Sequence, residues 1–492
     1  MSIADRKPLT TVVLLPDGVG LRNFVLGPFL NEMSRLGPVH AFHLVEDHAL
    51  DMYASRYRDS VQWHRLLNMV DTPVTNVLRR SISYAQMYWV DSPPMRLALE
   101  LPVSGSLRSQ VAVRLSRAIG RICANPSRMG MLERAHVRAL ANSPEVAHFR
   151  RKFEEIKPDV IFCSHQRPPH VSYPVIAARQ LGIPTSTFVF SWDNLSSKGR
   201  FATPFDHFLL WSEHMRQELF RFFPDVTPER THVVGTPQFD PYKDESLAWS
   251  REEFFARIGA DPKRKLICFS GGDEDASRSD PYHVRALMEL IRSGRIKGNP
   301  QVFLRPAPVD KGTRYDAVRR DYPELLYERP QWLFGRSEAT NYLMPKPEDV
   351  QFLANLTRHA DLNVNFASTM TLDFSIHDKP VVNCVFEVTE KPLFPNRTLW
   401  EFVSGFEHYQ PVVKLGAARM AYTREQFADH INAYLADPSL DREGRRKFVE
   451  LEISVPVGQS SRAIAATLQR IAGRLPAEAG AVNAGEAAAH RR

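Results

Sequence analysis

The sequence predicts an α/β protein built from two doubly wound, Rossmann-like domains that face each other across a cleft. Three observations lead to this prediction. Apolar runs typical of buried parallel strands alternate with amphipathic, helix-like segments in the first half of the chain. The same alternation restarts near residue 265. At 492 residues, the chain is also too long for one ordinary hydrophobic core.

The first half opens with a strand, a glycine loop, a helix and a second strand. Residues 10–37 read TTVVLLPDGVGLRNFVLGPFLNEMSRLG, and the apolar run VHAFHLV follows at 39–45. Further strand-like runs occur at 159–164, 185–191 and 207–212. A βαβ opening followed by more such units predicts a parallel sheet with helices on its faces.

Between about residues 47 and 157 the pattern changes to helix-like segments rich in arginine, which predicts a helical insertion in the first domain. Its arginines include Arg79, Arg80, Arg108, Arg114, Arg117 and Arg121. Two interpretations are open: a solvated helical face, or a docking face for an anionic membrane or polymer.

The domain boundaries are predicted from changes in composition. A polar, interrupted stretch separates the two alternating halves, and the chain ends in a low-complexity run of alanine, glycine and glutamate. We predict an N-terminal domain at 1–240, a linker at 241–264, a C-terminal domain at 265–457, a C-terminal helix at 458–473 and a disordered tail at 474–492.

Composition and charge narrow the class of protein. The formal net charge of +7 permits an acidic partner, but no finger, zipper or aromatic-interleaved basic motif occurs, which argues against nucleic acid. The four cysteines show no metal-ligand spacing and indicate reduced thiols in a cytosolic protein. The N-terminus lacks the plan of a signal peptide, and no apolar run approaches the ~20 residues of a membrane span. We expect a cytoplasmic protein, either free or peripheral at the inner face of the cell membrane.

In doubly wound folds, ligands bind beyond the carboxyl ends of the strands. The candidate site residues at these positions in the first half are Asp17, Arg22, Asn23, His165, Arg167, Trp192, Asp193, Asn194 and Lys198. Asp193 is the preferred candidate for a general base, with Asp17 and His165 behind it. For Asp17 a helix-cap or turn role is equally open. Lys198 is a candidate phosphate ligand.

The second half carries a matching set. Gly271 and Gly272 follow a strand and resemble a loop that lets phosphate approach the backbone, and Arg305 ends the next strand, where a guanidinium can grip a diphosphate. Ser368 and Thr369 lie where a strand meets a helix, so they form either an anion site or an ordinary helix cap. Asp373 follows one turn later.

Two acidic residues follow the glycine loop. Asp273 and Asp275 have the chemistry of a divalent metal site, but acidic residues in such loops more often cap the next helix.

Four stretches resemble the GT-B superfamily of nucleotide-sugar glycosyltransferases. They read VVGTPQFDPY at 233–242, SWDNLSSKGR at 191–200, RPAP at 305–308 and ADLNVNFASTMTLDFSIHDKPVV at 360–382. The last is closest in form to the CDP-glycerol glycerophosphotransferase family, and SWDNLSSKGR and RPAP resemble motifs of the same family. Two positions depart from that family: Ala307 and Asp193 stand where it has histidines.

The resemblance implies a GT-B-like fold with a division of roles between the domains. The C-terminal domain would bind the donor diphosphate through Gly271, Gly272, Arg305, Ser368 and Thr369, with Asp373 near the ribose. The N-terminal domain would present the acceptor through Arg22, Asn23, Arg167, Trp192, Asn194 and Lys198. No resident cofactor or metal is implied, because protein cations stabilise the leaving diphosphate in such enzymes.

The resulting functional hypothesis is a cytoplasmic glycosyltransferase. It would move a sugar from a nucleotide-sugar donor onto a surface polysaccharide, such as a capsule or other cell-envelope glycan, or onto a lipid-linked acceptor. Three alternatives are a CDP-glycerol or CDP-ribitol phosphotransferase, a nucleotide-sugar 2-epimerase, and a non-catalytic carbohydrate-binding subunit.

Overall fold

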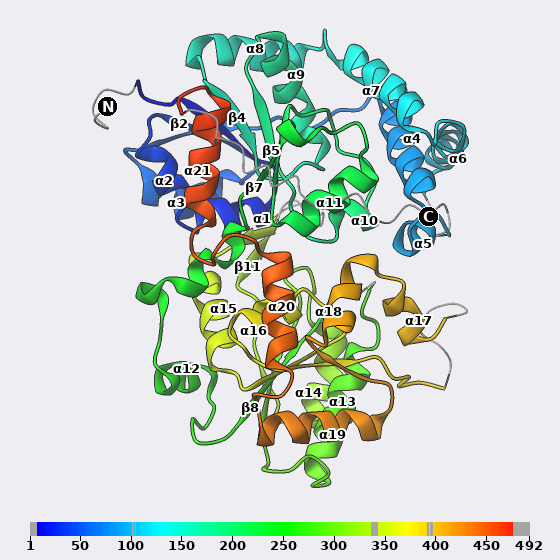
Figure 1. Cartoon of the computed structure of the whole chain (residues 1–492), viewed down its shortest axis with the longest axis vertical. Helices are drawn as coiled ribbons and strands as arrows, with labels where there is room; N and C mark the ends of the chain where they lie inside the picture. The colour runs from blue at the N-terminus through cyan, green and yellow to red at the C-terminus, as the bar shows by residue number, and fades with distance from the viewer. Residues whose placement is uncertain are drawn as a thin grey trace, which may run out of the picture.

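Two parallel sheets, each covered by helices, form the two halves of the molecule (Figure 1). The computed structural model describes residues 7–100, 103, 105–274, 276–335, 343–390, 393 and 397–475. The predicted α/β class with two doubly wound halves is confirmed. The predicted tail at 474–492 lies outside the described residues apart from its first two.

The first sheet has seven parallel strands in the order β3-β2-β1-β4-β5-β6-β7. They are β1 (Thr11–Leu15), β2 (Val39–His43), β3 (Val61–Arg65), β4 (Val160–Cys163), β5 (Thr185–Phe188), β6 (His207–Leu210) and β7 (Thr231–Val233). All five residues of β1 are buried, as expected for a central parallel strand covered on both faces. The strand order reverses direction between β1 and β4, so the loops after these two strands border the switch point.

Helices of the first half cover this sheet and form the predicted insertion. They are α1 (Gly18–Gly20), the π-helical turn η2 (Leu21–Val25), α2 (Phe29–Ser34), α3 (Asp47–Ala54), η3 (Ser55–Tyr57), α4 (Pro73–Val90), α5 (Pro93–Glu100), α6 (Leu107–Ile122), α7 (Pro126–Leu140), α8 (Pro144–Ile156), η4 (Pro169–Val171), α9 (Ser172–Gln180), α10 (Asn194–Ser197), α11 (Glu213–Phe222) and η5 (Pro228–Arg230). Helices α4, α7 and α8 each begin with a capping side chain followed by proline, at Thr72, Asn125 and Ser143.

The insertion differs from the prediction in one element. Residues 47–157 were expected to be helical, but β3 lies within them and adds an edge strand beside β2. Only Val61 of this strand is buried, because an edge strand is covered on one side at most. Its sequence VQWHR therefore lacks the apolar run that marks the inner strands.

The second sheet has six parallel strands in the order β10-β9-β8-β13-β14-β15. They are β8 (Leu266–Ser270), β9 (Gln301–Arg305), β10 (Leu326–Tyr327), β13 (Leu362–Asn365), β14 (Val381–Cys384) and β15 (Arg419–Ala421). An antiparallel pair, β11 (Trp332–Phe334) and β12 (Leu343–Pro345), stands apart from it. Here the switch point lies between β8 and β13.

Helices and turns of the second half surround this sheet. They are η6 (Pro237–Lys243), η7 (Glu245–Leu247), α12 (Arg251–Ile258), α13 (Asp280–Arg292), η8 (Thr313–Tyr315), α14 (Asp316–Asp321), α15 (Pro347–His359), α16 (Met370–Ile376), α17 (Leu399–Ser404), η10 (Glu407–Tyr409), α18 (Gln410–Leu415), α19 (Arg424–Ala436), α20 (Arg442–Glu452) and α21 (Ser460–Ile471). The stretch predicted as a linker thus contains α12, which packs on α15.

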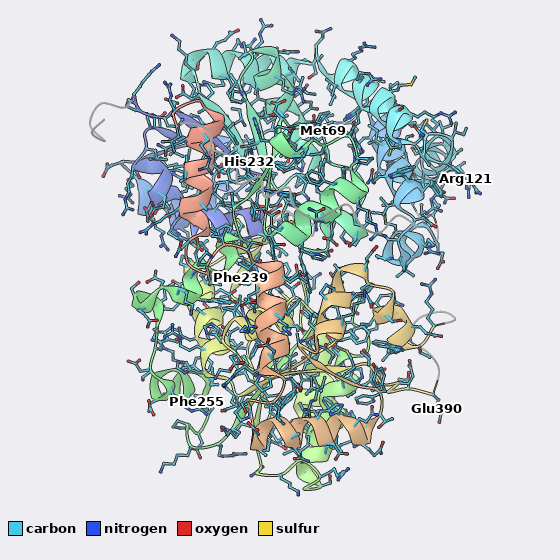
Figure 2. All side chains as sticks on the ribbon, in the orientation of Figure 1. Met69, Arg121, His232, Phe239, Phe255 and Glu390 are labelled. Atoms are coloured by element: carbon cyan, nitrogen blue, oxygen red, sulfur yellow. The ribbon has the colours of Figure 1, made fainter. Side chains whose placement is uncertain are left out.

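The chain passes between the halves twice, and hydrogen bonds connect the two segments that cross. After β7, η6 leads to the second half, and Phe239 lies buried where the halves meet (Figure 2). The last helix, α21, returns to pack on α2 of the first half (Figure 1). Asp240 accepts the backbone N–H groups of Ser460 at 3.1 Å and Ser461 at 2.8 Å. This carboxylate therefore fastens the returning helix to the outgoing segment.

Three of the four cysteines lie buried in the central strands β4, β8 and β14, and all four are free thiols. None of the helices that the structure describes combines the length and the hydropathy needed to span a bilayer.

Candidate functional site

A cavity of about 760 Å³ lies between the two sheets. Loops that follow β1, β4 and β5 line it from the first half, and loops that follow β8, β9 and β13 line it from the second. These loops border both switch points, where doubly wound folds bind ligands. All of the predicted site residues except Asn23 and Trp192 line this cavity.

Asn23 and Trp192 do not line the cavity themselves but contact residues that do. The side-chain oxygen of Asn23 is buried and accepts the Nε–H of Arg22 at 2.9 Å, so Asn23 supports a lining residue from behind. The indole N–H of Trp192 donates to the Thr369 hydroxyl at 3.3 Å, and its ring packs against Phe448 of α20. Trp192 therefore joins the two halves beside the cavity.

His165 and Asp17 form a buried pair at the first switch point. The Asp17 carboxylate bonds Nδ1 of His165 and also accepts the backbone N–H of Gly20 at 2.8 Å. Burial raises the pKa of Asp17, but the charge and hydrogen bond of His165 outweigh it and hold that pKa below its ordinary value. The ionised carboxylate makes Nδ1 the donor, which leaves the lone pair of a neutral imidazole on Nε2.

The other ring nitrogen of His165 faces no protein partner. Among the described residues, Nε2 is buried without a hydrogen bond, and the ring stacks on Phe190 with centroids 3.9 Å apart. A histidine oriented by a carboxylate, with its second nitrogen free beside a cavity, has the geometry of a general base.

Asp193 is held differently from His165. One carboxylate oxygen accepts the Ser197 hydroxyl at 2.7 Å, and the other accepts the Asn194 amide at 3.2 Å. Burial raises the pKa of Asp193, but the charges of His408 and Lys198 together with hydrogen bonds bring it well below the ordinary value. A strongly ionised carboxylate with both oxygens engaged is a weak proton acceptor, so the geometry favours His165 over Asp193 as the base.

The other predicted acceptor residues surround this side of the cavity. Arg167 is exposed along the rim, and Lys198 is half-buried. The Asn194 side-chain oxygen accepts the Gln166 amide at 3.1 Å, which fixes its orientation. These side chains line the same cavity as His165.

Arg305 is the buried cation of the second half. Its Nη2 donates to both carboxylate oxygens of Asp349, at 2.9 and 3.0 Å. Asp349 also accepts from the backbone of Gln331 and from the Trp332 indole, each at 2.8 Å. Among the described residues, Nη1 of Arg305 is buried without a partner. The guanidinium is thus clamped at one nitrogen and free at the other, beside the cavity.

Asp373 connects three parts of the chain. Tyr242 of η6 donates its hydroxyl to the Asp373 carboxylate, and the charge of Arg22, from the first half, acts on the same carboxylate. Burial nevertheless raises the pKa of Asp373 to about 6. Asp373 is therefore a carboxyl group whose protonation changes near neutral pH, at the point where both halves and the crossing segment meet.

The glycine loop after β8 approaches its neighbours closely. A Cβ on Gly271 would lie 2.4 Å from the Tyr315 hydroxyl, and one on Gly272 would lie 2.2 Å from the Ser277 hydroxyl. The backbone N–H of Gly272 donates to Asp280 at 2.8 Å. Close packing within the protein therefore requires these glycines, independently of any ligand.

The two hydroxyl residues at the junction after β13 have different partners. The Ser368 hydroxyl accepts the backbone N–H of Met370, the first residue of the short helix α16, at 3.3 Å. Thr369 occupies the N-cap position without a capping side-chain bond, and its hydroxyl accepts from Trp192. Both residues line the cavity, so these bonds and a ligand role for the hydroxyls are compatible.

The structure describes only one of the two aspartates that follow the glycine loop. Asp273 lines the cavity, whereas Asp275 lies outside the described residues. Within the ranges that the structure describes, no group of three or more histidine, cysteine or acidic side chains is arranged to hold a metal ion.

Sequence reasoning missed two residues of the site. Asp349 lies in the first turn of α15 within the stretch PEDV, where an acidic residue reads as an ordinary feature of a helix start. Tyr242 lies in VVGTPQFDPY, which the sequence marks only as a boundary. Neither residue lies directly after a strand of the two large sheets, where doubly wound folds bind their ligands, so the sequence carries no signal for either.

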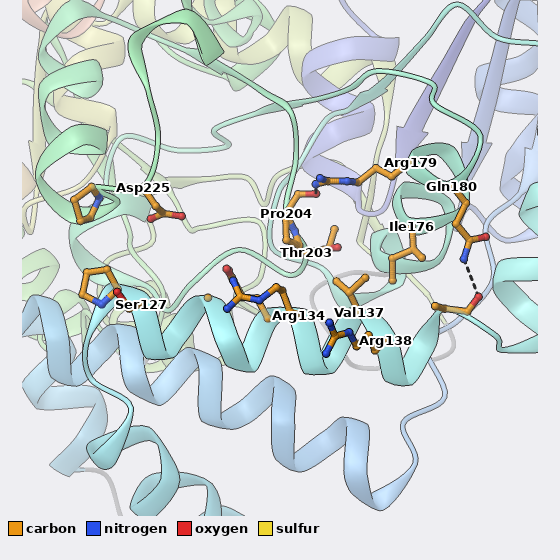
Figure 3. Close-up of a pocket in the computed structure, with 15 residues that line it drawn as sticks. Ser127, Arg134, Val137, Arg138, Ile176, Arg179, Gln180, Thr203, Pro204 and Asp225 are labelled. Carbon is orange, nitrogen blue, oxygen red and sulfur yellow. Dashed lines mark hydrogen bonds between the residues drawn. The ribbon is translucent and has the colours of Figure 1, made fainter.

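A second cavity, of about 900 Å³, lies in the first half between α7 and the loops around Thr203 and Asp225 (Figure 3). Its acidic residues Glu133 and Asp225 both pair with the buried Arg200, each with a closest contact of 2.6 Å. None of the predicted site residues lines it.

Comparison with solved structures identifies the architecture. A UDP-N-acetylglucosamine 2-epimerase matches with a TM-score of 0.52 and 11% identity, over 94% of this chain and 96% of that one. The UDP-GlcNAc 2-epimerase from Neisseria meningitidis bound to UDP-GlcNAc matches at 0.51 and 10%, over 94% and 100%. A glycosyltransferase from Rickettsia africae matches at 0.50 and 9%, over 94% and 99%. The fold is GT-B.

At these identities the likeness establishes the GT-B fold and nothing finer. No protein-family model matches the sequence, and no curated protein matches it. The resemblance to the CDP-glycerol glycerophosphotransferase family therefore rests on the short motifs alone.

Proposed function

We propose that this protein is a GT-B enzyme that binds a nucleotide sugar in the cavity between its halves and transfers the sugar to a surface-polysaccharide or lipid-linked acceptor. One observation carries the proposal. Two buried nitrogens that have no hydrogen-bond partner among the described residues, Nη1 of Arg305 and Nε2 of His165, lie beside one cavity on opposite halves of the molecule. Unpaired buried polar groups are costly, so a pair of them beside a cavity indicates a ligand that completes them.

The second half would hold the donor. The free Nη1 of Arg305 would bind a diphosphate oxygen, while Asp349 keeps the guanidinium in place. Ser368 and Thr369 would contribute hydroxyls, the Gly271–Gly272 loop would lie alongside the diphosphate, and Asp373, which also lines the cavity, would accept from ribose hydroxyls. The Neisseria epimerase of the same fold is bound to UDP-GlcNAc, which supports a nucleotide sugar as the ligand class.

The first half would activate the acceptor. An acceptor hydroxyl gives its proton to Nε2 of His165 as its oxygen bonds the anomeric carbon of the sugar. The bond from that carbon to the diphosphate oxygen breaks, and the negative charge that forms on the diphosphate lies beside Arg305. Asp17 stabilises the imidazolium that results. Arg167, Asn194 and Lys198 would orient the acceptor.

No resident cofactor or metal is part of the proposal, because Arg305 supplies the positive charge at the leaving group. A lipid-linked acceptor would bring the enzyme to the inner face of the cell membrane.

A second candidate is nucleotide-sugar 2-epimerisation. The observation that favours it is that two of the structures of this fold described above are UDP-GlcNAc 2-epimerases. Such a reaction also needs a base beside the sugar, so the His165–Asp17 pair fits both reactions. Polyol phosphotransfer is the weaker alternative, because Ala307 and Asp193 replace histidines of that family's motifs. A non-catalytic carbohydrate-binding subunit is the remaining one.

The test is a product analysis with a panel of nucleotide sugars. The protein is incubated with each donor alone and with candidate glycan and lipid-linked acceptors, and nucleotide and sugar products are separated. Transfer predicts nucleoside diphosphate release that depends on an acceptor, with the sugar attached to it. A sugar inverted at its second carbon without any acceptor establishes the epimerase instead. Binding without either product supports the non-catalytic subunit.

A further inference from the structure

Helix α6 carries an apolar stripe on the surface of the insertion. Leu107, Val111, Leu115 and Ile122 are 74%, 55%, 49% and 68% exposed. At about 100° per residue, these four positions fall within about 80° of the helix circumference. Large exposed apolar residues that gather on one face of a helix mark an interaction surface more often than scattered ones do.

The opposite face of α6 holds the helix on the protein. Val113, Ser116 and Gly120 are buried there. A Cβ on Gly120 would lie 2.6 Å from Cβ of Tyr84 in α4, so the two helices are in close contact. Figure 1 shows α6 on the outer side of α4, at the margin of the first half. The apolar stripe is therefore turned away from the core on a helix that is fixed in place.

Arginines border the stripe on both sides. At about 100° per residue, Arg108 falls on one side of it, and Arg114 and Arg121 fall on the other. All three are exposed, and none of them forms an ion pair within the described part of the chain. Arg121 extends from the outer margin of the molecule in Figure 2. The sequence contains no acidic residue between Glu100 and Glu133, so this surface is positively charged without local compensation.

We propose that this face of α6 docks the protein on an anionic lipid bilayer. A helix that presents apolar side chains bordered by arginine can bury the former at the acyl boundary while the latter meet lipid headgroups. A second copy fits less well, because pairing two such faces would bring arginines against arginines. An acidic protein or polymer without apolar groups would leave the stripe exposed to water. The proposal does not depend on the chemistry of the cavity.

The first experiment measures sedimentation of the full chain with vesicles. Phosphatidylcholine vesicles are compared with vesicles that also contain phosphatidylglycerol. We expect binding to the anionic vesicles, little binding to the neutral ones, and weaker binding in about 0.5 M salt, where charges are screened within a few ångströms.

Two variants separate the apolar and the charged parts of the surface. Val111→Asp/Leu115→Asp places charge in the stripe, and Arg114→Glu/Arg121→Glu reverses its border. Because all four side chains are exposed, both variants should fold, which circular dichroism and the melting temperature check. Each should bind anionic vesicles at least about tenfold more weakly.

The matched control for charge is Lys263→Glu/Arg320→Glu. It changes the net charge by the same amount as Arg114→Glu/Arg121→Glu does, at exposed positions in the second half. It should bind vesicles like the wild type, because docking depends on a local surface and not on the total charge.

Three results would overturn the proposal. They are wild-type protein that stays in solution with anionic vesicles, α6 variants that bind like the wild type, and a control variant that loses binding as they do. A solution dimer that Val111→Asp/Leu115→Asp converts to monomer would show instead that a second copy covers the stripe.

Discussion

His165 is positioned to accept a proton because Asp17 fixes one ring nitrogen, while the other has no hydrogen-bond partner in the part of the chain that the structure describes. Under the proposed function, His165→Ala should lower turnover by about 100-fold or more, the usual contribution of a general base. Nucleotide affinity should stay unchanged, because Arg305 and the residues of the second half bind the donor. Turnover and nucleotide titrations on the same preparation measure both quantities.

Asp193→Asn is the matched variant for this prediction. Asparagine keeps the volume, and its oxygen can still accept from Ser197. If His165 is the base, Asp193→Asn should affect turnover far less than His165→Ala. The reverse order of the two effects would restore Asp193 as the base.

The Asp373 carboxyl group should make stability depend on pH. Its pKa is raised from 3.8 to about 6 by burial, so the native state binds this proton more tightly than the unfolded state does. As pH rises from about 4 to about 6, ionisation of the buried group removes up to about 3 kcal/mol of stability, and above about pH 6 the whole cost is present. Asp373→Asn cannot ionise and escapes this cost.

The measurement compares melting temperatures of the wild type and Asp373→Asn at several pH values. The variant should gain stability relative to the wild type as pH rises through this window, because asparagine can still accept from Tyr242. A difference between the two proteins that is the same at about pH 4 and about pH 7 would contradict the argument.

The sequence predicts the candidate bases of the site but does not decide between them. That Asp17 and His165 follow strands could be predicted, and so could their place at one sheet edge. Strand order decides which strand ends are adjacent, and here β1 lies beside β4, so Asp17 contacts His165. Asp193 instead forms hydrogen bonds with Ser197 and Asn194. The candidates were therefore predictable, but their relative merit as bases was not.

At the scale of elements, the junction of the halves depends on one close approach. Helix α1 packs against β12, and a Cβ on Gly18 would lie 1.6 Å from the backbone oxygen of Leu343. Gly18→Ala should therefore separate these elements and destabilise the protein by about 2 kcal/mol, the usual cost of overpacking. A melting temperature lowered by about 2 °C or more would show this.

Gly130→Ala in α7 is the matched control. Its added Cβ would meet only the flexible guanidinium of Arg134, at 3.4 Å, and alanine favours helix. This variant should be neutral or up to about 1 kcal/mol more stable. Equal effects of the two alanine substitutions would show that α1 and β12 are not in tight contact.

Elements were predictable where their own sequence carries the signal. Buried strands such as TVVLL in β1 show an apolar run, and helices such as α4 begin with a capping residue and proline. The edge strand β3 shows no such run, because only one of its five side chains is buried and the others need not be apolar. Helix α12 lies in the stretch predicted as a linker, because it is short and largely polar, yet its apolar residues Phe254 and Phe255 are buried.

At the scale of the whole molecule, the site exists only because two sheets place their strand ends around one cavity. The repetition of the α/β pattern predicted two such sheets, and most of the predicted site residues line the cavity. The contribution of the crossing segment was not predictable, because Tyr242 reaches Asp373 only through the path of the chain between the halves. The return of α21 to the first half was not predictable for the same reason, because it too depends on the path of the chain.

The central claim is that Arg305 binds the diphosphate of a nucleotide donor in this cavity. The most direct measurement is the melting temperature of the wild type and of Arg305→Ala with UDP, CDP, GDP, dTDP and CMP, with and without EDTA. A ligand at a hundredfold excess over its Kd stabilises the native state by about 2.7 kcal/mol. Arg358→Ala, which removes a cation paired with Glu245 away from the cavity, serves as the control.

We predict that at least one nucleoside diphosphate stabilises the wild type and Arg358→Ala equally. EDTA should not change this shift, CMP should give little, and Arg305→Ala should lose it. No shift with any nucleotide in the wild type, or an undiminished shift in Arg305→Ala, would contradict the account.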